Sequence, residues 1–296
     1  MSVRTQPESE VWWRGQPLNW LSCETLKKVL LKIEYDGSAY HGWQIQSNHI
    51  TIEEVIEKNL QTIIGSFVKV KGSSRTDSGV HAIGQTATIT IPDDIPLRRL
   101  FISLNSLLPC DIAITDMVLV DLSFCERINA GKRYRYKINN SGRRKAIDSG
   151  FFWWVKDQLD QDKMREAARD LIGRKNFQAF QGKGGQANSF VKEITSITLD
   201  WEKTRDFDHL EVVVEGSGFL KHMVRNIVGT LVDIGRGRLP SDTFKKALKS
   251  NLRADLGMTA PAKGLILEKV FYHPDPFLVR TEENPEDTIS YYNRHG

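Results

Sequence analysis

The sequence has little cysteine, no long apolar run and no strong excess of charge of either sign. Its three cysteines, Cys23, Cys110 and Cys125, form no C-x-x-C pair and have no histidine at zinc-ligand spacing. The pattern therefore indicates neither a disulfide framework nor a structural zinc site, and a reduced, cytoplasmic compartment is expected. No apolar run reaches about 18 residues, and the run from Thr5 to Glu10 is polar where a signal peptide would be apolar. Neither export nor a membrane span is predicted.

The charge balance is only mildly basic. Lysine and arginine number 41 and aspartate and glutamate 37, which gives a formal net charge of +4 over 296 residues. An acidic partner is compatible with this balance but is not demanded by it, so the placement of the charges has to decide. The hydrophobic content of 40% is that of an ordinary globular chain able to bury a core or two.

Apolar periodicity predicts the same element order twice. After an N-terminal extension at 1–28, the first part predicts strand, helix, strand, strand, helix and strand, with Thr51 and Glu54 as a capping box. These elements are expected at 29–35, 52–64, 67–70, 86–91, 97–108 and 112–118. The second part predicts the same order at 131–138, 162–173, 194–201, 210–214, 219–234 and 265–272, with a small extra helix at 242–248.

The repeated order is the ferredoxin-like one, βαββαβ. We therefore predict an α+β fold of two such halves, 29–120 and 121–273, followed by a polar and mobile tail at 274–296. Their largely antiparallel sheets are expected to join around a central cleft.

The stretch from Ser73 to Gln85 is predicted to be a loop at one rim of a sheet. In extended backbone Arg75 and Asp77 point the same way, which would put a fixed cation beside a carboxylate and suit an aspartate that stays ionised. The alternative is ordinary turn chemistry, since Asp-Ser-Gly is a common turn sequence.

Two further segments concentrate cations or rings. In the strand 131–138, Arg133, Arg135 and Lys137 share one face, and the tyrosines Tyr134 and Tyr136 occupy the other. This suits phosphate binding and base stacking, or else a half-exposed strand with solvated charges.

In the predicted helix 219–234, Lys221 and Arg225 are four residues apart, and two like charges on one face favour a bound anion or are simply solvated. The loop 36–48 offers the rings and amide of Tyr40, His41, Trp43 and Gln44 to unstacked bases, or uses Trp43 as a core anchor.

The string Arg-Thr-Asp-x-Gly-Val-His-Ala at 75–82 resembles the active-site motif of the tRNA pseudouridine synthase A family. Four other segments resemble that family's motifs in the same order: Y-D-G-x-x-Y-x-G-W-Q, K-R-Y-R-Y, F-L-x-H-M-V-R-N-I-V-G and A-P-A-x-G-L. The resemblance covers about residues 29 to 272.

This resemblance implies an isomerase that converts uridine to pseudouridine at positions 38, 39 and 40 of the tRNA anticodon stem-loop. It implies that Asp77 acts as the nucleophile at C1′ or as the base at C2′, that Tyr134 stacks on the uracil and is a candidate to take the C5 proton, and that Arg225 pairs with Asp77. The central cleft would then bind RNA, with no cofactor and no metal, in a homodimer. The substrate-binding residues expected with them are Arg75, Tyr134, Leu265, Trp43, Gln44, His81 and Lys221.

Three other functions stay open at this point. A relative within the family would modify other tRNA uridines, and a non-catalytic relative would only bind RNA. A glycoside hydrolase would need a second carboxylate to work with Asp77, which none of the motifs supplies.

Overall fold

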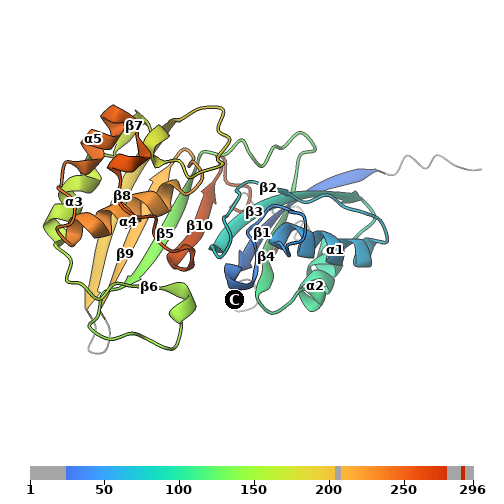
Figure 1. The fold of residues 1–296 in the computed structure, drawn as a ribbon. Coiled ribbons are helices and arrows are strands. Elements are labelled where there is room, and N and C mark those ends of the chain that lie inside the picture. Colours follow the sequence, from blue (N-terminus) through green and yellow to red (C-terminus); the bar gives the residue numbers. More distant parts are fainter. Residues whose placement is uncertain (1–24, 204–207, 279–287, 291–296) are drawn as a thin grey trace, which may run out of the picture.

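The computed structural model describes residues 25–203, 208–278 and 288–290, and its two halves lie side by side (Figure 1). The predicted N-terminal extension lies outside the described residues up to position 24, and its last residues belong to the first strand instead. The elements of the first half are β1 (Leu26–Tyr35), α1 (Ile52–Ile64), β2 (Lys71–Gly72), β3 (His81–Pro92), α2 (Leu97–Leu107) and β4 (Ile112–Val120).

The second half repeats this order with extra short elements. Its repeat is formed by β5 (Gly131–Asn139), α3 (Gln161–Arg169), β8 (Val191–Lys203), β9 (Asp208–Gly216), α4 (Met223–Gly235) and β10 (Leu265–Phe271). The additional elements are β6 (Trp153–Trp154), β7 (Gly173–Asn176), α5 (Thr243–Ser250) and β11 (Thr288–Ser290).

One continuous sheet runs through both halves. Its strand order is β11-β4-β1-β3-β10-β5-β9-β8-β7, with β2 added to β3 and β6 to β5. Within each half the four strands of the repeat lie in the order fourth, first, third, second, which is the ferredoxin-like order that the sequence predicts. The halves join where β10 runs parallel to β3, with Ile266 opposite His81, whereas the long neighbouring strands within each half are antiparallel.

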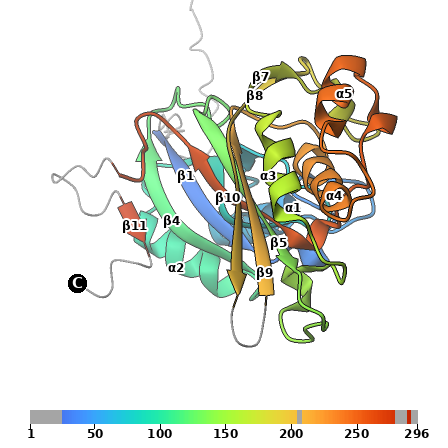
Figure 2. The ribbon, with the colours of Figure 1, turned by 90° about the vertical axis from the view of Figure 1, so that its left-hand side faces the viewer.

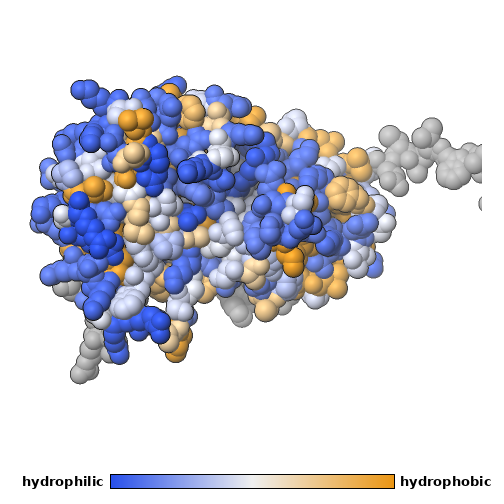
Figure 3. All heavy atoms as spheres, in the orientation of Figure 1, coloured by the Kyte–Doolittle hydropathy of each residue, from blue (hydrophilic) through white to orange (hydrophobic). Residues whose placement is uncertain are grey.

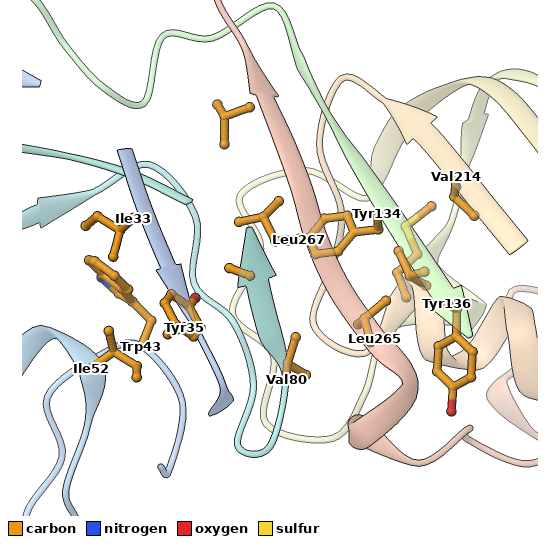
Figure 4. Close-up of a cluster of buried hydrophobic side chains, with 14 of the residues drawn as sticks. Ile33, Tyr35, Trp43, Ile52, Val80, Tyr134, Tyr136, Val214, Leu265 and Leu267 are labelled. Atoms are coloured by element: carbon orange, nitrogen blue, oxygen red, sulfur yellow. The ribbon is translucent and has the colours of Figure 1, made fainter. Parts of the chain in front are cut away.

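The main helices of both halves cover the same face of this sheet. Tyr35 is paired with Ala82, Ala82 with Leu267, Leu267 with Tyr134 and Tyr134 with Val214, and residues directly opposite each other point to the same face. On this face Ile33 lies beside Trp43 and Ile52 of the α1 region, and Tyr136 points toward the second half's helices (Figure 4). Figure 2 shows the strands and helices of both halves after a rotation of 90° from the view of Figure 1.

Several predicted boundaries are wrong, and each has a local reason. Residues 67–70 are not a strand, because the Val70 amide donates to Glu57 Oε1 on α1 rather than to a neighbouring strand. The predicted loop 73–85 ends earlier, since β3 already begins at His81, which pairs with Ile266 of β10, and Ala82 pairs with Tyr35 of β1.

The capping box does not form, because Thr51 makes no side-chain cap bond and Glu54 pairs with Lys58. The tail contributes β11, which pairs with β4 in an antiparallel register.

Candidate active site

A cleft of about 1030 Å³ opens between the two halves on the helix-covered side of the sheet. The first half lines it with residues of the loops 41–49 and 72–80. The second half lines it with β5, the segments 181–192 and 219–225, and Leu265, and Arg127 lines it from the connection between the halves. Asp77 is the only carboxylate among the described residues that line it. The protein surface drawn in Figure 3 is largely hydrophilic, with apolar residues in separate patches.

The loop that carries Asp77 is fixed from behind by the loop 36–48. The Trp43 amide donates to the Thr76 carbonyl (3.1 Å), and the buried Tyr35 hydroxyl lies 2.8 Å from Thr76 Oγ1. Gly42 has φ of +91°, and a Cβ there would lie 2.6 Å from the Thr76 carbonyl oxygen, so this contact needs glycine. Tyr35 and the loop 36–48 therefore hold the backbone at Thr76, next to Asp77, while the side chain of Asp77 faces the cleft.

Asp77 has two basic neighbours at the start of α4, the permanently charged Arg225 and His222, which is charged only when protonated. Arg225 Nη1 and His222 Nε2 each lie 3.6 Å from Asp77 Oδ2, a distance for ion pairing rather than for hydrogen bonding. His222 has φ of +61°, and this left-handed residue is why the helix begins at Met223 and not at Phe219 as the sequence predicts. Burial lowers the pKa of His222, with Arg225 and Lys221 adding to that effect and Asp77 opposing it.

Arg225 is held in place by the segment that precedes β10. Its Nε donates to the Ala260 carbonyl (2.8 Å), and the Ala260 amide donates to the Arg225 carbonyl (3.0 Å). The guanidinium is thus oriented before any substrate binds, which a lysine's single charged group would not reproduce.

Tyr134 lies in the floor of the cleft and bonds across the junction of the halves. Its hydroxyl is 3.1 Å from Ser74 Oγ, and its ring meets Phe219 edge to face with centroids 5.3 Å apart. Burial raises the pKa of Tyr134 to about 12, with the negative charge of Asp77 contributing. The phenol is therefore protonated at neutral pH, which disfavours the predicted role of taking the C5 proton as a phenolate.

The structure brings five of the predicted substrate-binding residues to the cleft. Leu265 and Tyr134 are buried in its floor, and Arg75, Gln44 and Lys221 are exposed along it. Arg75 does not form the expected ion pair with Asp77 among the described residues. Lys221 precedes α4, so it does not share a helix face with Arg225 as predicted.

Trp43 and His81 do not line the cleft. Trp43 is 2% exposed and packs over Gly72, where a Cβ would lie 2.4 Å from its Nε1, so it is the core anchor that the sequence left as an alternative. His81 is also 2% exposed, and its Nε2 lies 3.1 Å from the Lys263 carbonyl oxygen of the second half. Its visible role is to tie the two halves together.

The cations of the β5 stripe are paired and face away from the cleft. Arg133 pairs with Glu215 and Glu268, and Arg135 with Glu211 and Glu268, on the sheet face opposite the helices. Lys137 lies 4.0 Å from Glu211. The predicted phosphate-binding face is therefore neutralised by glutamates of β9 and β10, which the β5 sequence alone does not reveal.

Sequence reasoning missed His222 and Ser74 as members of the site. His222 lies in a helical apolar pattern, and only its left-handed backbone turns its ring toward Asp77. Ser74 reads as turn chemistry, and its partner Tyr134 is 60 residues away in the chain. The signal available for His222 was its place within a motif that also supplies Arg225.

Comparisons with known proteins identify the family of this chain. A family model described as tRNA pseudouridine synthase matches residues 32–126 and 167–273, which together are more than half of the chain. The chain belongs to this family.

Curated relatives of this tRNA pseudouridine synthase family support the assignment. The tRNA pseudouridine synthase A of Myxococcus xanthus is 42% identical over 252 residues, covering 85% of this chain and 94% of the relative. That of Geotalea uraniireducens is 42% identical over 248 residues, covering 83% and 100%. Family membership makes the chain an isomerase that acts on uridine in RNA.

A chain of a solved Cbf5-Nop10-Gar1 complex aligns with this tRNA pseudouridine synthase family member at a TM-score of 0.29 and 10% identity. The alignment covers 69% of this chain and 54% of that one, and a likeness this weak supports no conclusion about fold or function. No helix of the described residues is long and apolar enough to cross a membrane.

Proposed function

We propose that this protein isomerises uridine to pseudouridine in the anticodon stem-loop of tRNA, at positions 38, 39 and 40, in the cytoplasm and as a homodimer. The observation that carries the proposal is the placement of Asp77. Among the described residues that line the cleft between the two halves it is the one carboxylate, and it lies beside Arg225 and His222, with Tyr134 in the floor. Such a cleft suits a nucleotide turned out of an RNA loop.

The reaction needs one bond broken and one formed at the same sugar carbon. In the covalent route Asp77 attacks C1′ as the N1 to C1′ bond breaks, the uracil rotates, C5 displaces the carboxylate from C1′, and the C5 proton is lost. In the glycal route Asp77 takes the C2′ proton as uracil leaves and returns it after C5 has bonded to C1′, and the C5 proton is then lost. In either route N1, freed from C1′, ends protonated, so the loss of the C5 proton is balanced. Arg225 stabilises the ionised carboxylate in either route, and the ring of Tyr134 holds the base.

A glycoside hydrolase is disfavoured, because it requires two carboxylates about 5 to 10 Å apart. Asp77 has no such partner among the described residues lining the cleft. A relative acting on other tRNA uridines is separated from the proposed function by the position that is modified. We therefore propose mapping pseudouridine in tRNA from cells with and without this protein, where loss at 38, 39 and 40 is expected.

The catalytic part is tested by Asp77→Asn, which removes the charge and keeps the shape. Tritium release from C5-labelled uridine in tRNA should be abolished, while tRNA affinity stays within a few-fold because base chemistry and phosphate binding use different groups. Turnover near the wild-type rate in this variant would remove Asp77 from the mechanism and favour the RNA-binding alternative.

A further inference from the structure

Five lysines and arginines that line the cleft, Arg75, Lys221, Arg127, Lys132 and Lys192, form no ion pair in the described part of the chain, and the last three lie close enough for their charges to act on one another. Arg127 follows β4 in the connection between the halves, Lys132 is on β5 and Lys192 is on β8, and all three line the cleft. None of them forms an ion pair within the part of the chain that the structure describes. The neighbouring cations Arg133 and Arg135, one and three residues further along from Lys132 on the opposite face of β5, are both paired with glutamates.

The three unpaired cations repel one another. Burial, together with the positive charges of Lys192 and Arg127, lowers the pKa of Lys132 to about 8. The ammonium group is fixed by one hydrogen bond, from Lys132 Nζ to the Ser73 carbonyl (3.0 Å). Like charges brought together from three segments destabilise the fold unless an anion lies among them.

The cluster of Arg127, Lys132 and Lys192 lies next to Tyr134 in the floor of the cleft. Lys132 and Tyr134 are two residues apart on β5, so both point to the cleft face about 7 Å apart. Their partners are also consecutive, since Ser73 accepts from Lys132 and Ser74 contacts Tyr134. A ligand whose base lies on Tyr134 would therefore present its neighbouring groups to Lys132.

We propose that Arg127, Lys132 and Lys192 form a subsite for a backbone phosphate next to the nucleotide whose base lies on Tyr134. This inference rests on the proposed function, because it takes the occupant to be RNA. A phosphodiester supplies the missing negative charge, and three separate donors, from the connection between the halves, from β5 and from β8, line the cleft to receive it. The chemistry recognised is that of phosphate, which inorganic phosphate shares.

The first experiment removes the negative charge of one RNA phosphate and, separately, the positive charge of Lys132. A substrate stem-loop RNA is prepared with single neutral methylphosphonate linkages around the target uridine, and its affinity is measured for wild type and for Lys132→Gln. One flanking linkage should weaken wild-type binding roughly tenfold and weaken Lys132→Gln binding far less. The matched control is Lys163→Gln, on α3 and outside the cleft, which should behave as wild type.

Equal losses in wild type and Lys132→Gln at every linkage would overturn the subsite. The wild-type protein is assayed for pseudouridine formation on the same RNA. An inactive wild type would count against the proposed function, whereas an active wild type with equal losses would count against the subsite alone.

The second experiment uses the titration of Lys132. An anion binds the protonated amine better, so wild-type affinity for the RNA should fall as the pH rises from about 7 to 9, through the pKa of Lys132. Lys132→Arg stays charged and should bind with little change over that range, and Lys132→Gln should bind weakly throughout. A fall in Lys132→Arg equal to that of wild type would contradict the assignment.

Inorganic phosphate separates the two possible sources of the ligand. At constant ionic strength, replacing chloride by phosphate should displace RNA only weakly, because a single anion lacks the contacts of the strand. Strong competition through Lys132 together with no methylphosphonate effect would identify a free-anion site and overturn the RNA subsite.

Discussion

Asp77 is positioned by side chains and backbone from both halves of the molecule. Its loop is held by Tyr35 and Trp43 of the first half, and its basic neighbours His222 and Arg225 belong to the second. Small substitutions at these contacts should therefore change the rate more than the fold.

Arg225→Ala should lower the single-turnover rate roughly 100-fold or more, because the guanidinium is the permanent charge next to Asp77. The remaining basic neighbour, His222, is charged only when protonated. Losing Arg225 removes one cause of the lowered pKa of His222. The residual rate should consequently rise as the pH falls toward 6, and Arg225→Lys should keep more activity. The measurement is rate against pH at saturating enzyme. A wild-type rate in Arg225→Ala would contradict the ion-pair role.

Ser74→Ala should slow the reaction about 5-fold to 10-fold without weakening tRNA binding, since it removes one hydrogen bond to the Tyr134 hydroxyl. If Ser74 acts only through that hydroxyl, the same substitution should have little effect in a Tyr134→Phe background. The double-mutant cycle is measured by single-turnover kinetics. An equal slowing in both backgrounds would show that Ser74 acts on the loop instead.

At the scale of elements, α4 and the segment 253–260 depend on each other. Arg253 donates to Asn226 Oδ1 (3.2 Å), Thr259 Oγ1 donates to the same oxygen (2.6 Å), and the segment passes directly over Gly229. This close approach fixes the first turn of α4 and hence the side chain of Arg225.

Gly229→Ala should lower the free energy of unfolding by about 1 to 3 kcal/mol, although alanine favours a helix. A Cβ at this position would lie 1.9 Å from the Met258 carbonyl oxygen, so the segment must move. Gly142→Ala is the control, because nothing lies within 4 Å of a Cβ there. Urea unfolding of both variants tests this, and equal stability would show that the segment adjusts without cost.

Arg135→Gln should affect stability and not RNA binding. It leaves Glu211 and Glu268 without their main partner, but the Arg135 side chain is a third exposed to solvent, so the loss should be only about 1 kcal/mol. The slope of RNA affinity against salt should match wild type, whereas Lys132→Gln should reduce it by about 0.7 to 0.9. A reduced slope in Arg135→Gln would restore the β5 stripe as a phosphate-binding face.

For the whole molecule, the continuous sheet predicts a single cooperative unfolding transition. The halves share the β3–β10 pair and a buried polar chain in which Thr86 Oγ1 lies 2.8 Å from the Tyr272 hydroxyl and 2.7 Å from Ser73 Oγ. Tryptophan fluorescence, with buried Trp43 and Trp153 in different halves, should follow the same urea curve as far-ultraviolet circular dichroism. Two separate transitions would show that the halves unfold independently.

The sequence by itself determined the order of elements, the ferredoxin-like repeat and the motif residues Asp77, Tyr134 and Arg225. These follow from local periodicity and from strings of neighbouring residues, which do not depend on distant parts of the chain. For the same reason the alternation of Arg133 and Tyr134 to opposite faces of β5 was predictable.

Only the tertiary structure decided which face of β5 lines the cleft and which cations are neutralised there. Glutamates on β9 and β10 pair with Arg133 and Arg135, and these strands lie up to 135 residues further along the chain. The same is true of Trp43 and His81. Trp43 is buried because it packs over Gly72, and His81 is buried because the second half packs over it. Charge pairing and burial depend on side chains that meet across the sheet, and a one-dimensional pattern does not contain those distances.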